Sequence, residues 1–193
     1  MCPWGWLGVV WGGARAPRYG RNVERIAIIG PGGAGKSTLA RELGRRLDLP
    51  VVHLDVLFWQ PGWVEPDRDE WEALNRQLVQ GERWIMDGNY GGTMEIRLAA
   101  ADTIVFLDPP PLLCIWRVIR RRRAGPRIDL APYLDERVGA RDFLAFVTYI
   151  WRYRRTRRPT VEERIARQAT GKQVHVLRSR RDVKRFLALV SRP

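Results

Sequence analysis

Apolar and polar positions along the chain form two kinds of segment. Short apolar runs, most of them rich in valine and isoleucine, predict buried β-strands over residues 25–29, 50–55, 84–88, 103–108 and 173–177. Between them, apolar residues recur every three or four positions, which predicts amphipathic helices. These helices cover residues 36–47, about 67–80, 93–100, 110–123 and 138–155, and 181–190.

Strands that alternate with helices predict an α/β fold, in which a parallel sheet is covered by helices on both faces. We therefore expect a three-layer sandwich around a five-stranded parallel sheet. In such a sheet, ligands bind at the carboxyl ends of the strands. Gly30, Asp55, Asp87 and Asp108 all fall at these ends, so the candidate chemistry gathers at one edge.

The first apolar run leads into a glycine-rich segment that matches the pattern G-x-x-x-x-G-K-[ST]. Its residues are Gly30, Pro31, Gly32, Gly33, Ala34, Gly35, Lys36, Ser37 and Thr38. Glycines let consecutive backbone N–H groups converge on phosphate oxygens, and the following helix adds its positive dipole end. Packing alone would explain a glycine-rich turn, but it would leave the Lys36–Ser37 pair unexplained. The segment predicts a phosphate-binding loop of the P-loop NTPase type.

ATP and Mg²⁺ are the expected ligands of this loop. Gly30, Gly32, Gly33, Ala34, Gly35 and Thr38 are predicted to cradle the phosphates together with Lys36 and Ser37. Lys36 would place its charge on the β- and γ-phosphates, and the Ser37 hydroxyl would ligate Mg²⁺.

Three aspartates close apolar runs and are candidates for the remaining chemistry. Asp87 precedes a glycine and is predicted to place Mg²⁺ together with Ser37; a turn or cap is its alternative. Asp108 is a rival for this role, but the prolines that follow it start a helix, which favours a cap. Asp55 is predicted to close the second strand and to orient or deprotonate an acceptor hydroxyl, with a turn cap as its alternative.

Two neighbours of Asp55 have less specific predictions. His53 is predicted to be structural. The turn-forming segment 59–63, with Trp59 and Trp63, either lines an acceptor pocket or packs in the core.

The composition narrows the class of protein. The chain has 193 residues, of which 45% are hydrophobic and 28% charged, so it can build one sizeable core and is not a disordered polymer. No apolar run approaches the roughly 18–20 residues of a membrane span. Two cysteines, Cys2 and Cys114, offer no disulfide framework or metal-ligand set, and they favour free thiols in a reducing cytoplasm.

The positive charge is concentrated in the second half of the chain. The formal net charge is +13, yet residues 1–108 carry 12 basic and 14 acidic residues, whereas residues 109–193 carry 22 and 7. Such a basic half implies an anionic partner, which can be nucleotide phosphates, nucleic acid or an acidic membrane surface. Arg117 and Arg121, at positions i and i+4 of a predicted helix, share a face and can stabilise a transferring phosphoryl group.

These arginines belong to a predicted arginine-rich helical lid over about residues 117–158. Within it, the cluster from Arg152 to Arg158 follows an aromatic helix and fits nucleic acid phosphates equally well.

The first 22 residues differ from the rest. They contain no acidic residue, three tryptophans and no periodicity of either kind. We expect a disordered tail, or translated sequence upstream of the true start, followed by a single domain over residues 23–193.

Four stretches resemble one group of enzymes, the P-loop kinases of the adenylate kinase-like superfamily, and within it the bacterial DNA topology modulation proteins. The stretches are residues 30–38, 53–55 with 59–63, 84–90 with Arg97, and 112–121, and the similarity spans about residues 25–190.

The resemblance implies roles for individual residues. Asp87-Gly88-Asn89-Tyr90 is similar to the D-G-F-P-R region of adenylate kinases, where the aspartate organises Mg²⁺ and the arginine contacts phosphate. Gly91 and Gly92 stand where that arginine is expected, and Arg97 is a candidate substitute.

Other implied roles concern the acceptor, the lid and the base. Asp55 resembles the acceptor-side aspartate of shikimate and gluconate kinases. Arg117 and Arg121 resemble the lid arginines of the superfamily. Ser179 and Arg180 occupy the region that contacts adenine.

Together these features predict a Mg²⁺-ATP-dependent kinase with Lys36, Asp55, Asp87, Arg117 and Arg121 as catalytic candidates. Its partners would be a nucleotide and a small-molecule, nucleoside or nucleotide acceptor that no motif identifies. The alternative is a nucleic-acid-associated ATPase or binding protein that affects DNA topology.

Overall fold

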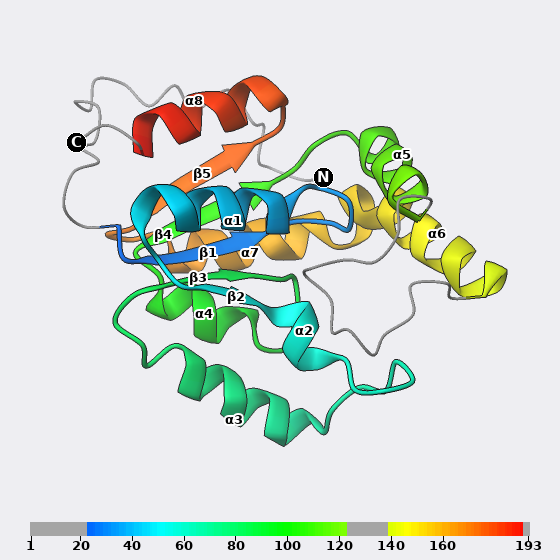
Figure 1. Ribbon diagram of the computed structural model, residues 1–193, viewed down its shortest axis with the longest axis horizontal. Helices are drawn as coiled ribbons and strands as arrows, with labels where there is room; N and C mark the ends of the chain where they lie inside the picture. Colours follow the sequence, from blue (N-terminus) through cyan, green and yellow to red (C-terminus); the bar gives the residue numbers. More distant parts are fainter. Residues whose placement is uncertain (1–22, 123–138, 191–193) are drawn as a thin grey trace, which may run out of the picture.

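The computed structural model describes residues 23–122 and 139–190. The predicted tail over residues 1–22 lies outside this part of the chain, as do Cys2 and the middle of the predicted lid. Five parallel strands form one sheet with the order β2-β3-β1-β4-β5 (Figure 1). Their bounds are Arg25–Ile29 (β1), Val51–His53 (β2), Trp84–Asp87 (β3), Thr103–Leu107 (β4) and Gln173–Leu177 (β5). The predicted α/β fold with a five-stranded parallel sheet is confirmed.

Helices cover both faces of the sheet. Their bounds are Lys36–Leu47 (α1), Leu54–Phe58 (α2), Arg68–Leu78 (α3), Met94–Ala100 (α4), Pro111–Arg122 (α5), Ala140–Thr156 (α6), Arg158–Gln168 (α7) and Arg180–Val190 (α8). None of the helices in the described part of the chain is long and apolar enough to cross a membrane.

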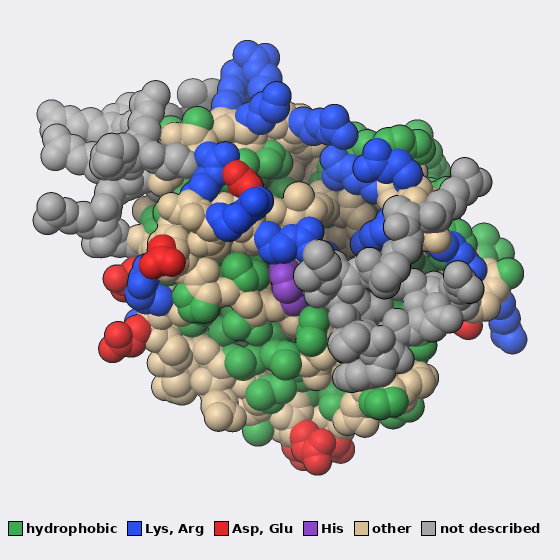
Figure 2. Space-filling view, viewed as in Figure 1, with side chains coloured by type: hydrophobic (Ala, Val, Ile, Leu, Met, Phe, Trp, Pro, Cys, Tyr) green, Lys and Arg blue, Asp and Glu red, His purple; other side chains and the backbone are tan. Residues whose placement is uncertain are grey.

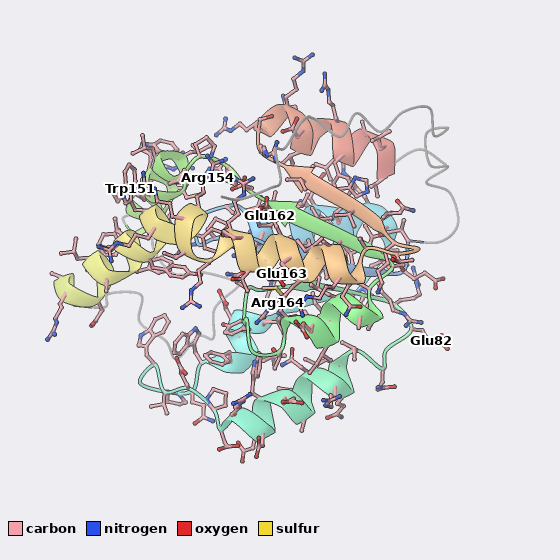
Figure 3. The ribbon with its side chains drawn as sticks, turned by 180° about the vertical axis from the view of Figure 1, so that it is seen from behind. Glu82, Trp151, Arg154, Glu162, Glu163 and Arg164 are labelled. Atoms are coloured by element: carbon pink, nitrogen blue, oxygen red, sulfur yellow. The ribbon has the colours of Figure 1, made fainter. Side chains whose placement is uncertain are left out.

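The alternation of side chains along β1 explains the three layers. Ile26 and Ile28 point to one face and pack in a core with α1, α5 and α8, whereas Ala27 and Ile29 point to the other, against α4 and α7. Seen from behind, α7 and α4 lie over this second face (Figure 3). Because β1 is buried on both sides, the glycine loop at its end has a rigid base.

The second predicted strand is shorter than expected. β2 ends at His53, and Asp55, which was predicted to close the strand, lies in the first turn of α2. An acidic side chain is favourable near a helix N-terminus, and Leu54 points into the core with 0% exposure. The helix therefore starts where the apolar pattern still continues.

Helix α7 was not predicted at all. Pro159 lies in its first turn, a position that proline favours, and Val161 and Ile165 are buried one helical turn apart. Charged residues fill most other positions, so its apolar stripe is too narrow to stand out in the sequence.

Candidate functional site

A cavity of about 830 Å³ opens at the carboxyl end of the sheet. Most of the residues singled out in the sequence line it: Gly32, Gly33, Ala34, Gly35, Lys36, Ser37, Thr38, Asp55, Arg117, Arg121, Ser179 and Arg180. Gly30 and Asp87 are not among its lining residues. Glu42 and Asp55 are the acidic residues of the lining, and basic residues clearly outnumber them. On this face, Lys and Arg side chains gather over α1, α5 and α8 (Figure 2).

The glycine loop depends on its glycines for both conformation and space. Gly33 and Gly35 have φ angles of 75° and 100°, which only glycine adopts without strain. A Cβ atom on Gly33 would lie 2.4 Å from the Cys114 carbonyl oxygen, and one on Gly32 would lie 2.5 Å from Phe146 Cζ. The loop is thus packed directly against α5 and α6.

The start of α1 is suited to an anion. Its N-cap is Gly35, which provides no side chain to accept hydrogen bonds from the first backbone N–H groups of the helix. Such N–H groups, with the helix dipole behind them, form a binding site for phosphate. Lys36 Nζ donates to the Pro31 carbonyl oxygen at 3.2 Å, so its ammonium group lies over the loop.

Arg117 reaches the loop from α5. Its Nη1 donates to the carbonyl oxygens of Gly33 at 3.3 Å and Ala34 at 3.0 Å. Burial lowers the pKa of its guanidinium, and the neighbouring Arg180 and Arg120 lower it further. Several cations therefore crowd one end of the cavity, an arrangement that an anionic ligand relieves.

Asp55 approaches the cavity from the side of β2 and β3. Tyr90 Oη donates to Asp55 Oδ1 at 2.7 Å. The Tyr90 ring itself packs against Phe58 and Trp71, with ring centres 4.3 and 5.2 Å away. The carboxylate therefore faces the cavity on a stiff aromatic support.

The Trp59 and Trp63 rings pack edge to face on each other at 5.4 Å. Neither tryptophan lines the 830 Å³ cavity.

Asp87 lies behind the loop, at the end of β3. It is 4% exposed, and its Oδ1 lies 2.5 Å from Nδ1 of His53. The contact arises because His53 and Asp87 are opposite each other in the β2–β3 register. His53 was predicted to be structural, and the structure gives it Asp87 as a partner, which the sequence alone does not show because it does not reveal which strands are neighbours.

The side-chain oxygen atoms near the loop are suitable ligands for Mg²⁺. The Ser37 hydroxyl lines the cavity, and Asp87 closes the strand next to β1. Within the described residues, no group of three or more His, Cys, Asp or Glu side chains forms a self-contained metal site. Mg²⁺ commonly binds through one or two protein oxygens, nucleotide phosphates and water, so these two residues fit it.

Arg97 does not replace the missing arginine at the cavity. It is 3% exposed and donates to Asn75 Oδ1 at 3.3 Å and to the Tyr90 carbonyl oxygen at 3.4 Å. Burial lowers its pKa to about 10, although Tyr90 and Asp87 oppose the shift. Arg97 therefore lies in the core, where its hydrogen bonds link α3 to Tyr90, three residues after Asp87.

Asp108 has a different environment from the predicted helix cap. Its buried carboxylate contacts Arg154, Arg158 and Arg178 at 3.2 to 3.8 Å. Two of these arginines belong to the cluster that fitted nucleic acid phosphates in the sequence. Their side chains are engaged within the protein itself.

No family model matches the sequence. Among solved structures, the chain is similar to shikimate kinase from Acinetobacter baumannii in complex with shikimate, with a TM-score of 0.54 and 16% identity over 86% of this chain and 90% of that one. Shikimate kinase from Bacteroides thetaiotaomicron gives a TM-score of 0.50 and 19% identity over 86% and 94%.

Deoxyadenosine kinase from M. mycoides, with products dCMP and a flexible dCDP bound, gives 0.48 and 15% over 86% and 95%. At these identities the likeness to the shikimate kinases concerns the fold, and the chain has the fold of the P-loop kinases.

Proposed function

We propose that this chain is a Mg²⁺-ATP-dependent phosphotransferase that moves the γ-phosphoryl group to a small hydroxyl-bearing acceptor. The observation that carries the proposal is the shared cavity, which is lined by Lys36 and Ser37 of the loop, three arginines of α5 and Asp55. A phosphate site, a source of positive charge and a proton acceptor are what phosphoryl transfer requires.

The donor nucleotide would occupy the glycine loop and the β4–β5 side. The N–H groups at the start of α1 and the Lys36 ammonium would hold the β- and γ-phosphates. Ser37 and Asp87 would hold Mg²⁺, which supplies charge neutralisation for the phosphate oxygens. Ser179 and Arg180, which follow β5 and line the cavity, would contact the nucleoside.

Asp55, which approaches the cavity from the β2–β3 side, would act on the acceptor. The acceptor hydroxyl oxygen attacks the γ-phosphorus while the Asp55 carboxylate takes its proton. The bond between the γ-phosphorus and the β,γ-bridging oxygen breaks, and ADP leaves. Arg117 and Arg121 stabilise the negative charge on the transferring group.

The central test is removal of the loop lysine. Lys36→Met should weaken ATP binding and lower transfer by about 10²-fold or more, since one charged contact to the β- and γ-phosphates is lost. Lys172→Met is a matched control, because Lys172 caps carbonyls at the end of α4, away from the cavity. ATP binding and ADP release should be measured at millimolar Mg²⁺. Unchanged ATP binding in Lys36→Met would contradict the proposal.

The acceptor is best sought by measuring ADP release over a panel of nucleosides, nucleotides, sugars and shikimate-like acids. We expect one class to stimulate release far above the hydrolysis of ATP by water. Silence across the whole panel would argue against a small-molecule kinase.

A second candidate function is nucleic acid binding coupled to ATP hydrolysis, in line with the sequence resemblance to DNA topology modulation proteins. One observation favours it: on α6, Trp151 is 55% exposed, and the nearby Arg152 and Arg155 are exposed as well. An exposed ring can stack on a base while arginines contact phosphates. Single-stranded DNA binding that weakens steeply with salt, and is lost in Trp151→Ala, would support this function.

A further inference from the structure

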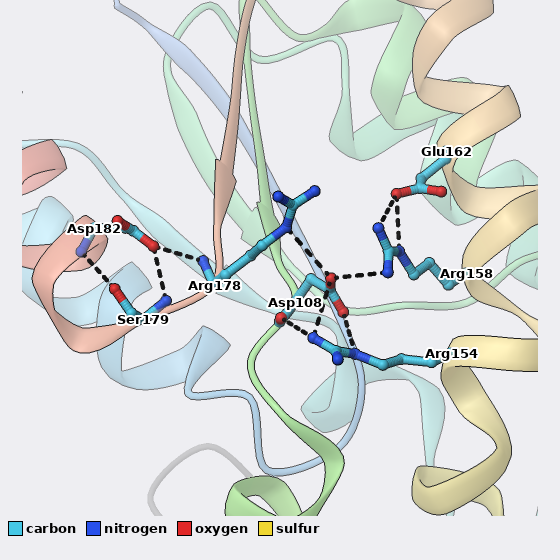
Figure 4. Close-up of polar contacts among 7 residues, drawn as sticks. All are labelled: Asp108, Arg154, Arg158, Glu162, Arg178, Ser179 and Asp182. Carbon is cyan, nitrogen blue, oxygen red and sulfur yellow. Dashed lines mark hydrogen bonds and ion pairs between the residues drawn. The ribbon is translucent and has the colours of Figure 1, made fainter. Parts of the chain in front are cut away.

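Asp108 joins α6, α7 and the end of β5, although the proposed chemistry gives it no task. Its side chain is buried, and Oδ1 accepts from Arg154 Nε of α6 at 3.2 Å. Oδ2 lies 3.4 Å from Arg158 Nη1 of α7 and 3.8 Å from Nε of Arg178, which follows β5 (Figure 4). One carboxylate therefore holds the helical pair α6–α7 and the end of the sheet.

The charge balance of this cluster is uneven. Glu162 accepts from Arg158 at 2.8 Å, so two carboxylates face three guanidinium groups. A buried carboxylate needs such partners, since an unpaired charge in the interior is costly. The surplus positive charge lies beside the cavity, because Arg178 is one of its lining residues.

Arg178 belongs to the segment that lines the nucleoside end of the cavity. The β4–β5 ladder ends where the Asp108 N–H donates to the Leu177 carbonyl oxygen at 2.9 Å. Beyond it, Asp182 Oδ2 accepts from the N–H groups of Arg178 at 3.1 Å and Ser179 at 2.9 Å. Those contacts tie the segment to α8, whereas the Arg178 side chain ties it to Asp108 and thereby to α6 and α7.

The sheet order separates this segment from the phosphate loop. β5 lies two strand spacings from β1, or about 10 Å. A triphosphate on the loop after β1 and a nucleoside beside residues 178–180 would therefore occupy different parts of the cavity. A change at Arg178, which directly follows β5, should affect the nucleoside and leave the phosphates in place, whereas Arg180 lies near Arg117, which contacts the loop.

We propose that Asp108 is a positioning residue for the nucleoside part of the bound nucleotide. It acts through Arg178, which it holds in place, and it fixes the segment of residues 178–180 relative to α6 and α7 through Arg154 and Arg158. The inference rests on the proposed function, because it requires a nucleotide in this cavity.

The test compares two ligands that differ by the nucleoside. Dissociation constants of the full chain are measured by calorimetry for Mg²⁺-ATP and for inorganic tripolyphosphate with Mg²⁺. Asp108→Asn and Arg178→Gln should each weaken ATP binding at least tenfold and change tripolyphosphate binding less than twofold. Arg181→Gln is the matched control, because this exposed arginine of α8 does not line the cavity. Equal losses for both ligands, or no loss, would overturn the proposal.

Two further arms keep the outcome decisive. The Arg178 side chain is 60% exposed, so Arg178→Gln removes no buried charge and gives the answer even where Asp108→Asn does not fold. In the double variant, ATP should bind no more weakly than in Asp108→Asn alone. If the two single losses of ATP affinity multiply in the double variant, Arg178 contacts the nucleotide independently of Asp108. That result would overturn the positioning role.

Failure of the proposed function looks different from failure of this inference. A wild-type chain that binds neither ATP nor tripolyphosphate overturns both. A wild-type chain that binds both ligands, with variants that bind ATP normally, overturns the positioning role alone.

Discussion

The carboxylates on the two sides of the glycine loop have different kinds of partner. On the β4–β5 side, the Asp108 carboxylate binds three guanidinium groups. On the β3–β2 side, a phenol holds Asp55, and an imidazole contacts Asp87. The first side offers positive charge to a ligand, whereas the second offers carboxylates.

This difference follows the charge of the two parts of the sequence. Residues 1–108 supply both candidate carboxylates and carry a net charge of −2, while residues 109–193 supply the arginines and carry +15. The sheet order places β1 between the two sides, so the phosphate loop lies where they meet. The polyphosphate of the proposed ligand would therefore lie between the arginines of one side and Asp55 of the other.

The largest expected effect concerns the carboxylate side alone. Asp55→Asn should lower kcat by about 10²- to 10⁴-fold, the range expected for loss of a general base, while ATP binding stays unchanged. Steady-state transfer and calorimetric ATP binding measure the two properties separately. Full transfer activity in Asp55→Asn would remove this residue from the mechanism and abolish the functional contrast between the sides.

The β5 side should be sensitive to acid through His175, which packs against Phe186 with ring centres 4.8 Å apart. Burial lowers the pKa of His175 from 6.5 to about 4. The unfolded state therefore binds the proton of His175 more readily than the folded state does. The contribution of neutral His175 to the free energy of unfolding is complete above pH 6.5. It is lost as the pH falls towards 4, by up to about 3 kcal/mol.

Urea unfolding of wild type and His175→Phe between pH 4 and 7 measures this effect. The difference in unfolding free energy between the two proteins should change across that range, which separates His175 from the carboxylates that also titrate there. A constant difference would contradict the prediction.

A smaller effect is expected at the back of the loop. Asp87→Asn should raise the Mg²⁺ concentration for half-maximal transfer by about 10- to 100-fold, as expected when a residue that organises a metal is neutralised. Asp69→Asn, an exposed aspartate of α3, serves as a control for the charge change. An unchanged Mg²⁺ requirement would assign Asp87 to a purely structural pair with His53.

The smallest effect tests how firmly Asp55 is held. Tyr90→Phe keeps the aromatic packing and removes one hydrogen bond, worth about 1 kcal/mol, so kcat should fall by about fivefold. Asp55→Asn should lose far more activity than Tyr90→Phe, because Tyr90 only holds the carboxylate that Asp55 supplies. A lower thermal stability with unchanged kcat would mean that Tyr90 only packs.

Several expectations followed from local sequence and survived in the structure. The apolar runs gave four of the strands to within a residue, and the G-x-x-x-x-G-K-[ST] pattern placed the turn between β1 and α1. These features depend on neighbours within a few residues, through backbone conformation and periodicity. The expected strand through Asp55 was wrong, and α7 was missed, because tertiary burial of Leu54, Val161 and Ile165 decides those two helices.

Local sequence is enough to predict most of the strands and helices, the glycine loop and the uneven charge. The polar groups that meet are set by the fold, because His53 and Asp87 are 34 residues apart, and Asp108 and Arg154 are 46 apart. Such contacts depend on the order of strands in the sheet and on how α6 and α7 return to it. That order is set by burial summed over the whole chain, and no short stretch of sequence records it.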